Sequence, residues 1–258
     1  MSRLRARCPD CRTFTAVALG PEYQCHACGR TFSAGLVRVP RAWGTGGDAM
    51  AEAASLELPF PEAGTVDEGS LSEQTLALAS ELPELPLVLG GCCCAHIGAV
   101  EGLAARHGRI SVVWFDAHGD LNTPESSPSG NAWGMPFRTL FESGAVAPED
   151  AVLVGGRNLD PPEEAFIASS GLHRDAEGIE KALEGTEGTY VAFDTDWLDA
   201  TEISVFMPEP GGPSLAEGEE LLRELVGRTT LLGAGITALR PDEANVAPVT
   251  RLCRALGL

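Results

Sequence analysis

The stretch VVWFDAHGD, residues 112–120, decides the fold expected of this chain. Apolar residues fill positions 110–115 almost without a break, which predicts a buried strand of a parallel sheet. Asp116, His118 and Asp120 follow at alternating positions, so they can converge at the strand's carboxyl end, where open α/β sheets hold ligands. Two carboxylates and an imidazole suit a divalent cation such as manganese or zinc. The alternative is a polar turn that caps the next helix.

A second acidic strand end accompanies the first. Residues 189–193, TYVAF, predict a short strand that is followed by Asp194 and Asp196, which lie two positions apart and therefore on one face. Together the two strand ends offer five ligands: Asp116, His118, Asp120, Asp194 and Asp196. Such a set is too large for one catalytic zinc and suits two metal ions that share bridging carboxylates.

These motifs resemble those of the ureohydrolase family, the arginases and agmatinases. The segment DAHGDLNTPESSPSGNAWGMP, residues 116–136, is similar to the family signature, FDTDWLD at 193–199 to its second aspartate motif, and GGRNLDPPE at 155–163 to its substrate-side loop. The resemblance covers roughly residues 85–250. It implies an arginase-like three-layer α/β sandwich with a parallel sheet and two divalent core metals (manganese, zinc or iron). It also implies catalytic roles for Asp116 and Asp120.

Two positions at the metal site depart from the family pattern. The family has Gly-Gly-Asp-His-Ser where this chain has Gly-Gly-Cys-Cys-Cys, so Cys93 takes the place of a metal-ligating histidine and would favour zinc or iron over manganese. His96, one helical turn further on, is an alternative ligand. The cysteines could otherwise be small packing residues. Trp133 stands where relatives carry a histidine thought to shuttle protons, which an indole cannot do.

The substrate side is changed as well. The family usually has a glutamate just beyond the last strand to hold a guanidinium group, whereas this chain has TALRP at 237–241, and Arg240 is expected to repel a cation. The resemblance implies four substrate-binding residues: Asp160 and Glu163 for an amino group, Asn122 and Ser129 for a carboxylate. Each of the four could instead cap a turn or a helix; Asp160 before two prolines is a good N-cap.

Composition narrows the classes of protein that fit. The chain has 258 residues, 44% of them hydrophobic, which suits one large α/β domain and a small module. Its net charge of −19 argues against nucleic-acid and anionic-membrane binding. It contains no signal-peptide pattern and no apolar run of about 18 residues, so a cytoplasmic location without membrane contact is expected. Eight cysteines without a secretory signal indicate a reducing compartment.

The first 40 residues are predicted to form a basic module. They hold six arginines against Asp10 and Glu22, a net charge of +4 that leaves −23 for residues 41–258. Their cysteines form two C-x-x-C knuckles separated by thirteen residues: Cys8, Cys11, Cys25 and Cys28. Paired knuckles predict a structural zinc ribbon, in which the metal replaces a core that forty residues cannot build. A redox dithiol or free thiols are the alternatives. The arginines favour a solvated face over an RNA or acidic partner.

The rest of the chain, residues 41–258, alternates predicted strands and helices. Strands are expected near 87–91, 110–115, 151–155, 188–193 and 230–236, and helices near 68–82, 96–107, 135–143, 161–170, 175–184, 214–227 and 241–256. Ser72 is the expected N-cap of the first helix. This order predicts a parallel sheet with helices on both faces.

Three functions are compatible with these features. The first, which we expect, is a metallohydrolase of the arginase and agmatinase family that acts on a non-peptide C–N bond of a guanidine- or amide-like small molecule through a metal-bridging hydroxide. The second is a catalytically altered metal-binding protein of the same fold, with a regulatory or scaffold role. The third is a thiol enzyme that uses residues 92–94 at a helix N-terminus, although no base for it is identifiable. Relatives usually form homo-oligomers, so the resemblance implies one here.

Overall fold

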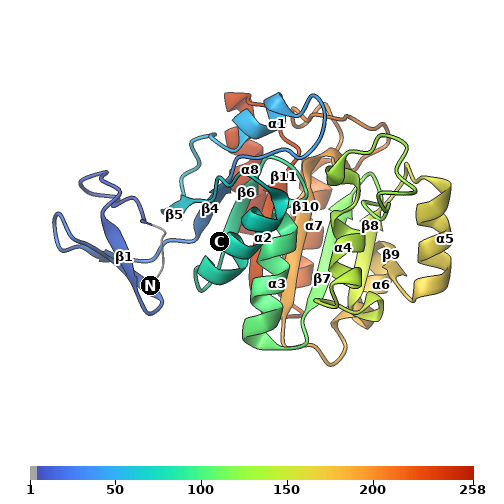
Figure 1. Cartoon of the computed structure of the whole chain (residues 1–258), viewed down its shortest axis with the longest axis horizontal. Coiled ribbons are helices and arrows are strands. Elements are labelled where there is room, and N and C mark those ends of the chain that lie inside the picture. Colours follow the sequence, from blue (N-terminus) through green and yellow to red (C-terminus); the bar gives the residue numbers. More distant parts are fainter. Residues whose placement is uncertain (1–4) are drawn as a thin grey trace.

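The computed structural model describes residues 5–258, so Arg3, one of the six arginines counted above, lies outside the described residues. A large parallel sheet lies between two layers of helices, and a small antiparallel sheet extends from one end (Figure 1). The predicted α/β sandwich with a parallel sheet is therefore confirmed. Within residues 5–258, no helix is long and apolar enough to cross a membrane.

In the described chain the large sheet has eight strands, all paired in parallel. Their order is β5 (Glu62–Thr65), β4 (Leu36–Val39), β6 (Leu87–Gly90), β11 (Leu231–Thr237), β10 (Thr189–Asp194), β7 (Ser111–Asp116), β8 (Ala151–Gly155) and β9 (His173–Arg174). The five predicted strands occupy consecutive central places, from β6 to β8. The sequence pattern missed the outer strands because they have only two to four residues each.

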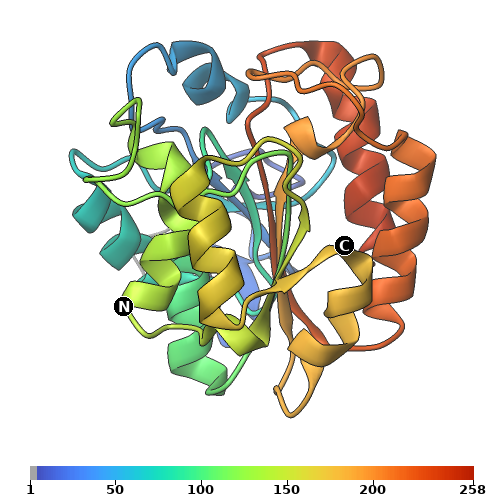
Figure 2. The same ribbon diagram turned by 90° about the vertical axis from the view of Figure 1, so that its right-hand side faces the viewer.

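Helices cover both faces of the sheet (Figure 2). One face carries α2 (Leu71–Glu81), α3 (Ala95–His107), α4 (Pro136–Glu142) and α5 (Pro161–Ser170). The other carries α6 (Asp175–Leu183), α7 (Leu215–Val226) and α8 (Val246–Ala255), while α1 (Asp48–Ala53) lies beyond the end of the sheet. The predicted N-cap of α2 was wrong. Ser70, rather than Ser72, accepts the Glu73 main-chain N–H, because only Ser70 stands three positions before that residue.

The central strand β7 divides its side chains between two apolar cores. Val112 and Trp114 pack on one face of the sheet, and Val113 and Phe115 on the other. Trp114 stacks on Phe137 of α4, with the ring centroids 4.6 Å apart. Burial on both faces explains the almost unbroken apolar run at 110–115 and leaves the carboxyl end of the strand as the place for polar chemistry.

The N-terminal module contains the small sheet β1 (Ala16–Leu19), β2 (Glu22–Cys25) and β3 (Thr31–Phe32). It adjoins the edge of the large sheet, where the Arg7 main-chain N–H donates to the Glu62 carbonyl at 2.9 Å. Strand β4 precedes residue 40 yet pairs with β6 in the large sheet. We therefore propose two domains whose boundary lies near residue 35, because this boundary leaves all strands of the large sheet, including β4, in the second domain.

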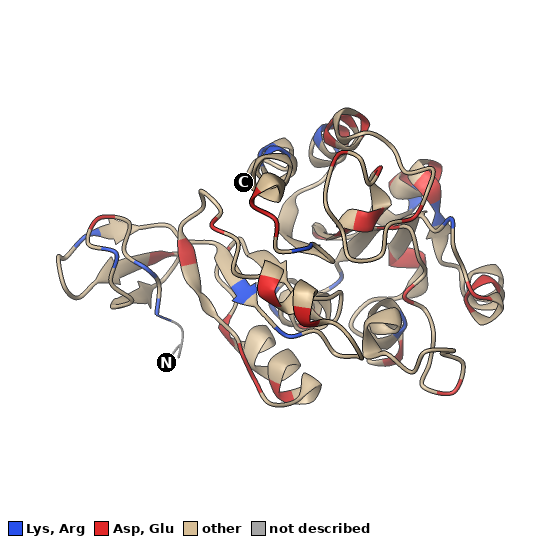
Figure 3. Cartoon of the chain, turned by 90° about the horizontal axis from the view of Figure 1, so that it is seen from above, with Lys and Arg blue, Asp and Glu red and all other residues tan. Residues whose placement is uncertain are grey.

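Two arginines of this module, and one arginine of the neighbouring strand β4, lie beside carboxylates. Arg7 pairs with Glu57 at 3.6 Å and Arg30 with Asp10 at 2.9 Å. Arg38, on β4, forms a buried pair with Glu62 at 3.0 Å. Figure 3 shows these basic segments beside acidic ones, while acidic residues are spread over the larger domain. Arg7 and Arg30 are thus partly exposed, as expected of a solvated face, whereas Arg38 is a buried structural charge.

Candidate metal centre and substrate cavity

Two neighbouring strands bring the acidic motifs together. β7 and β10 pair in parallel as far as Phe115 and Phe193, so Asp116 and Asp194 end adjacent strands at the same edge of the sheet. On its other side, β7 pairs with β8. The two strands lie so close at Gly155 that a Cβ atom on this residue would be 2.4 Å from the Asp116 carbonyl oxygen. Its φ of +110° also favours glycine.

Two groups of metal-ligand side chains share Asp116. The first contains Cys93, Asp116 and Asp120, whose ligand atoms all lie within 4.8 Å of one another. The second contains Asp116, His118 and Asp196 at the same spacing. A carboxylate common to two groups has the position expected of a bridging ligand in a two-metal site.

Asp194 contacts members of both groups. Its Oδ2 accepts a hydrogen bond from the Cys93 thiol at 2.9 Å, and its Oδ1 accepts the Asp196 main-chain N–H at 2.9 Å. Asp116 is held in turn by the Trp114 indole N–H, which donates to its Oδ2 at 3.0 Å. The structure thus brings all six predicted core ligands into one buried or partly buried cluster.

Asp120 gives the best test of whether a cation fits. Its Oδ2 is buried and has no hydrogen-bond partner among the described residues, a condition that calls for an ion or a water molecule. Its φ of +51° lies in the left-handed region, a strain that proteins keep at functional sites. Burial, together with the charges of Asp116 and Asp194, raises the pKa of Asp120 well above its usual range. A cation would relieve this repulsion, so the donor set fits divalent metal.

The imidazole of His118 lies among these carboxylates. Its Nδ1 is 3.0 Å from Asp196 Oδ2 and 3.5 Å from Asp116 Oδ1. Although burial opposes protonation, hydrogen bonds to Asp116 and Asp196 raise the pKa of His118 to about 12. Burial also opposes ionisation of Asp116, but the hydrogen bond and charge of His118 lower the pKa of that carboxyl. The protonated imidazole thus supplies the positive charge that a metal ion would supply to these carboxylates.

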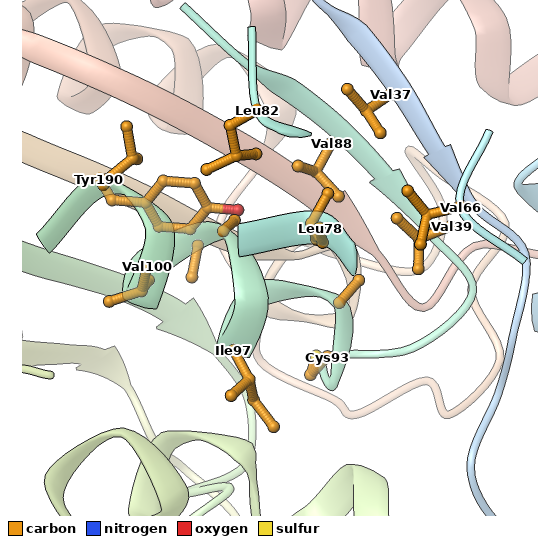
Figure 4. Packing of buried hydrophobic residues seen from close by; sticks show 14 of the residues in the cluster. Val37, Val39, Val66, Leu78, Leu82, Val88, Cys93, Ile97, Val100 and Tyr190 are labelled. Carbon is orange, nitrogen blue, oxygen red and sulfur yellow. The ribbon is translucent and has the colours of Figure 1, made fainter. Parts of the chain in front are cut away.

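Cys93, rather than His96, belongs to the ligand group. The Cys93 Sγ is 3.1 Å from Thr237 Oγ1 in addition to its contact with Asp194. The fully buried His96 places Nε2 3.3 Å from Thr237 Oγ1 and Nδ1 3.0 Å from Tyr190 Oη. Burial lowers the pKa of His96 to about 3, so the ring is neutral. Figure 4 shows Cys93 and Tyr190 in the apolar core around α2 and α3. His96 is therefore a core residue behind the thiol.

A cavity of about 280 Å³ opens onto the ligands. All four predicted substrate residues line it, Asn122, Ser129, Asp160 and Glu163, together with five ligands, Cys93, His118, Asp120, Asp194 and Asp196. The remaining wall is largely apolar and includes Met50, Trp133, Phe206, Met207 and Ala238. The cavity thus combines polar groups near the metal site with an apolar wall.

Asp160 and Glu163, two of the four predicted substrate residues, hold the start of α5. Both carboxylate oxygens of the buried Glu163 are engaged: they accept the main-chain N–H groups of Leu121 and Asp160, each at 2.9 Å. Asp160 begins α5 as its N-cap, and its Oδ2 accepts the Asn122 amide at 2.8 Å. The capping interpretation of Asp160 and Glu163 is therefore observed, while their position on the cavity wall leaves substrate contact open to them.

The departures from the family pattern have different consequences. Trp133 lines the cavity and packs edge-to-face on Phe206, with centroids 6.0 Å apart. A Cβ at Gly44 would come within 2.3 Å of the Trp133 ring, so the indole fits only against a glycine. The expectation for Arg240 was wrong: it is exposed, its Nε donates to the Val205 carbonyl at 3.0 Å, and it does not line the cavity.

The loop before α7 supplies site residues that sequence reasoning missed. Phe206 and Met207 line the cavity, and Glu209 lies 3.3 Å from His118 Nε2. This loop has neither helical nor strand periodicity, so pattern gave no reason to place it beside the ligands. The turn-forming segment MPEPGG, residues 207–212, was the available signal, and it indicates only a change of direction.

The N-terminal cysteines form a separate group. The Sγ atoms of Cys8, Cys11, Cys25 and Cys28 all lie within 4.8 Å of one another. The pairs Cys8–Cys28 and Cys11–Cys25 are each 3.6 Å apart. A tetrahedral zinc with Zn–S bonds of about 2.3 Å requires S–S separations near 3.8 Å, so the spacing fits one zinc ion.

Comparison with known proteins agrees with this fold. A sequence profile of the arginase family matches residues 49–255. The arginase of Staphylococcus aureus (strain COL) is 33% identical over 162 residues, which cover 53% of this chain and 54% of that protein. The arginase of Bacillus subtilis is 33% identical over 187 residues, covering 62% and 63%. The solved arginase of Bacillus caldovelox superposes with a TM-score of 0.73 at 25% identity, covering 86% of this chain and 97% of that one.

The fold and the site define an α/β protein with a carboxylate-rich candidate metal centre at the carboxyl edge of its sheet. The chain belongs to the arginase family. In sequence it spans between about half and two thirds of the length of the curated relatives that it matches.

Proposed function

We propose that this chain is a metal-dependent hydrolase that cleaves a non-peptide C–N bond of a guanidine- or amide-like small molecule. The observation that carries the proposal is the sharing of Asp116 by two ligand groups beside the cavity. When bound there, two divalent ions would lower the pKa of water and supply the nucleophile at neutral pH. Membership of a family whose named relatives are arginases supports hydrolysis.

Each part of the site has a task in this proposal. Cys93 and Asp120 would hold one ion, His118 and Asp196 the other, and Asp116 both; Asp194, which contacts Cys93 and Asp196, would complete the ligand set. The thiolate favours zinc or iron over manganese at the first position. The ribbon would hold a third, structural zinc. A cytoplasmic location and a homo-oligomer remain predictions.

The proposed substrate is less cationic at its reacting end than arginine, and the residues of the cavity wall support this choice. Ala238 stands on the cavity wall just beyond β11, where the family usually has a glutamate, so no carboxylate is offered there to a guanidinium group. Because Arg240 does not line the cavity, the expected loss of arginine binding comes from missing attraction rather than repulsion. Asp160 remains available at the wall to hold an amine, and Trp133 with Phe206 would exclude water from an apolar portion of the substrate.

A substrate screen tests the proposal. The full chain, loaded separately with Mn²⁺, Zn²⁺ and Fe²⁺, is assayed with amides, formamides, modified guanidines, arginine and agmatine for release of ammonia, urea or amine. We expect hydrolysis of a less cationic compound, which is lost in Asp194→Ala/Asp196→Ala. Ordinary turnover of arginine or agmatine would contradict the substrate assignment.

A metal-binding protein with a regulatory role is the second candidate, favoured by Trp133 in place of the proton-shuttling histidine. Trp133→His with Cys93→His tests it directly. Gain of urea release from arginine would show that those two changes account for a weak activity. If neither protein hydrolyses any compound of the screen with any of the three metals, the regulatory function replaces the enzymatic one.

A further inference from the structure

We propose that Glu209 is a positioning residue for the candidate metal ligand His118; the inference rests on the proposed metal centre. Glu209 Oε1 lies 3.3 Å from His118 Nε2. The other ring nitrogen, Nδ1, faces the carboxylates of Asp196 and Asp116 at 3.0 and 3.5 Å. Glu209 therefore contacts the edge of the imidazole away from the ligand group.

This contact selects how the ring can bind a cation. An imidazole whose Nε2–H donates to a carboxylate keeps its proton there and leaves Nδ1 as the ligand atom. The same hydrogen bond fixes the rotation of the ring about its χ2 bond. Outer partners of this kind are worth roughly 10–100-fold in metal affinity.

The carboxylate of Glu209 is itself oriented by Asn158. The Asn158 Nδ2 donates to the same Oε1 at 2.8 Å, and the Glu209 side chain is only 23% exposed. The Asn158 main-chain N–H donates to the Ala117 carbonyl at 2.9 Å. The amide that orients Glu209 is thereby tied to the residue immediately before His118.

Arg157 fastens the loop of Glu209 to the second acidic motif. Its Nη2 donates to the carbonyls of Asp196 and Glu209 at 2.7 and 3.1 Å. Its Nη1 and Nε donate to the carbonyls of Trp197 and Pro210 at 3.0 and 2.9 Å. One planar guanidinium thus binds two carbonyls of the ligand segment and two of the Glu209 loop. These hydrogen bonds fix the position of the Glu209 loop relative to the ligand segment at Asp196, and therefore relative to His118.

Metal titration of the full chain tests the inference. With the ribbon first saturated with Zn²⁺, Mn²⁺ binding is followed by electron paramagnetic resonance of the free ion, because thiolate sites bind Mn²⁺ poorly. We expect Glu209→Ala to weaken Mn²⁺ binding about 10–100-fold. Asn158→Ala should weaken it less, and Glu209→Gln should be intermediate, since its amide oxygen accepts a hydrogen bond without the charge. Glu220→Ala, an exposed carboxylate on α7, is the matched control and should not change it.

The outcomes separate this inference from the proposed function. If the wild-type chain binds neither Mn²⁺ nor any Zn²⁺ beyond the one equivalent of the ribbon, the proposed metal centre fails; if it binds only Zn²⁺, the same variants are compared by Zn²⁺ titration. If the wild type binds the metal and Glu209→Ala binds it equally well, the role of Glu209 alone is refuted.

A second measurement distinguishes positioning from folding. In the Zn²⁺-loaded wild type, ¹H–¹⁵N correlation spectra should show a His118 Nε2 proton that exchanges slowly with water and exchanges rapidly in Glu209→Ala. The unfolding midpoint of the chelated variant should equal that of the chelated wild type. A large fall in the chelated midpoint with unchanged Nε2 exchange would make Glu209 a structural residue and overturn the inference.

Discussion

The N-terminal cysteine group and the core ligand group concentrate metal donors in opposite physical settings. In the ribbon, four thiols come from two turns between Cys8 and Cys28, and two of them are exposed. In the core, donors between Cys93 and Asp196 meet at the end of a sheet that is packed on both faces. The ribbon lacks an extensive core of its own, whereas the large sheet is stabilised by apolar packing on both of its faces. Metal should therefore decide whether the ribbon folds and whether the core site works.

The largest expected effect tests the ribbon half of this comparison. Cys25→Ser should release its zinc and unfold the module before residue 35, because structural zinc contributes about 10–16 kcal/mol to such small folds. Elemental analysis and limited proteolysis measure both effects, and the larger domain should stay resistant. Cys253→Ser, in α8 and outside both ligand groups, is the control. Full zinc with a protease-resistant N-terminus would refute the ribbon.

The next effect tests the core half. Asp194→Ala with Asp196→Ala should remove the core metal while leaving far-UV circular dichroism unchanged, because the sheet does not depend on these side chains. In the wild type, metal at 100 times its Kd should raise the free energy of unfolding by about 2.7 kcal/mol. The double variant should lose this stabilisation. Asp199→Ala, at a half-buried position outside both core ligand groups, should keep the metal. Unchanged core metal in the double variant would disprove the ligand assignment.

Chelation should make stability depend on pH in a defined direction. Burial and neighbouring carboxylates raise the pKa of Asp120 and of Asp194. Unfolded aspartates ionise near pH 3.9, so above that pH the folded, chelated protein holds more protons than the unfolded chain. Its free energy of unfolding should therefore fall as pH rises toward the folded pKa values, and denaturant melts at several pH values measure this.

Two controls make the pH experiment specific. The same slope should be reduced in Asp120→Asn, because one of the responsible carboxyls is absent, and in the metal-loaded wild type, where the cation replaces protons. A chelated protein that becomes more stable between pH 5 and 8 would contradict the repulsion that the geometry indicates.

The smallest expected change concerns the choice of metal. Cys93→His should raise affinity for Mn²⁺ relative to Zn²⁺, because a thiolate is the softer ligand. Competitive loading followed by elemental analysis measures the ratio, with Cys92→Ser as the neighbouring control outside the ligand groups. An unchanged ratio would mean that Cys93 does not bind the ion.

Much of the fold was readable because it depends on local patterns. The run at 110–115 requires burial on both faces, and the paired C-x-x-C knuckles require four thiols at one point. The outer strands β4, β5 and β9 were missed because two to four residues carry too little periodicity to distinguish a strand from a loop.

The sequence by itself determined the chemical types at the site and the strand ends that carry them. Tertiary structure decided which of them meet. It placed Asp116 in two ligand groups, brought Cys93 rather than His96 into one of them, and left Arg240 outside the cavity lining. It also brought Glu209 to His118 from a loop without periodicity. These outcomes depend on the pairing of strands and the packing of loops far apart in the chain, which no local pattern of side chains records.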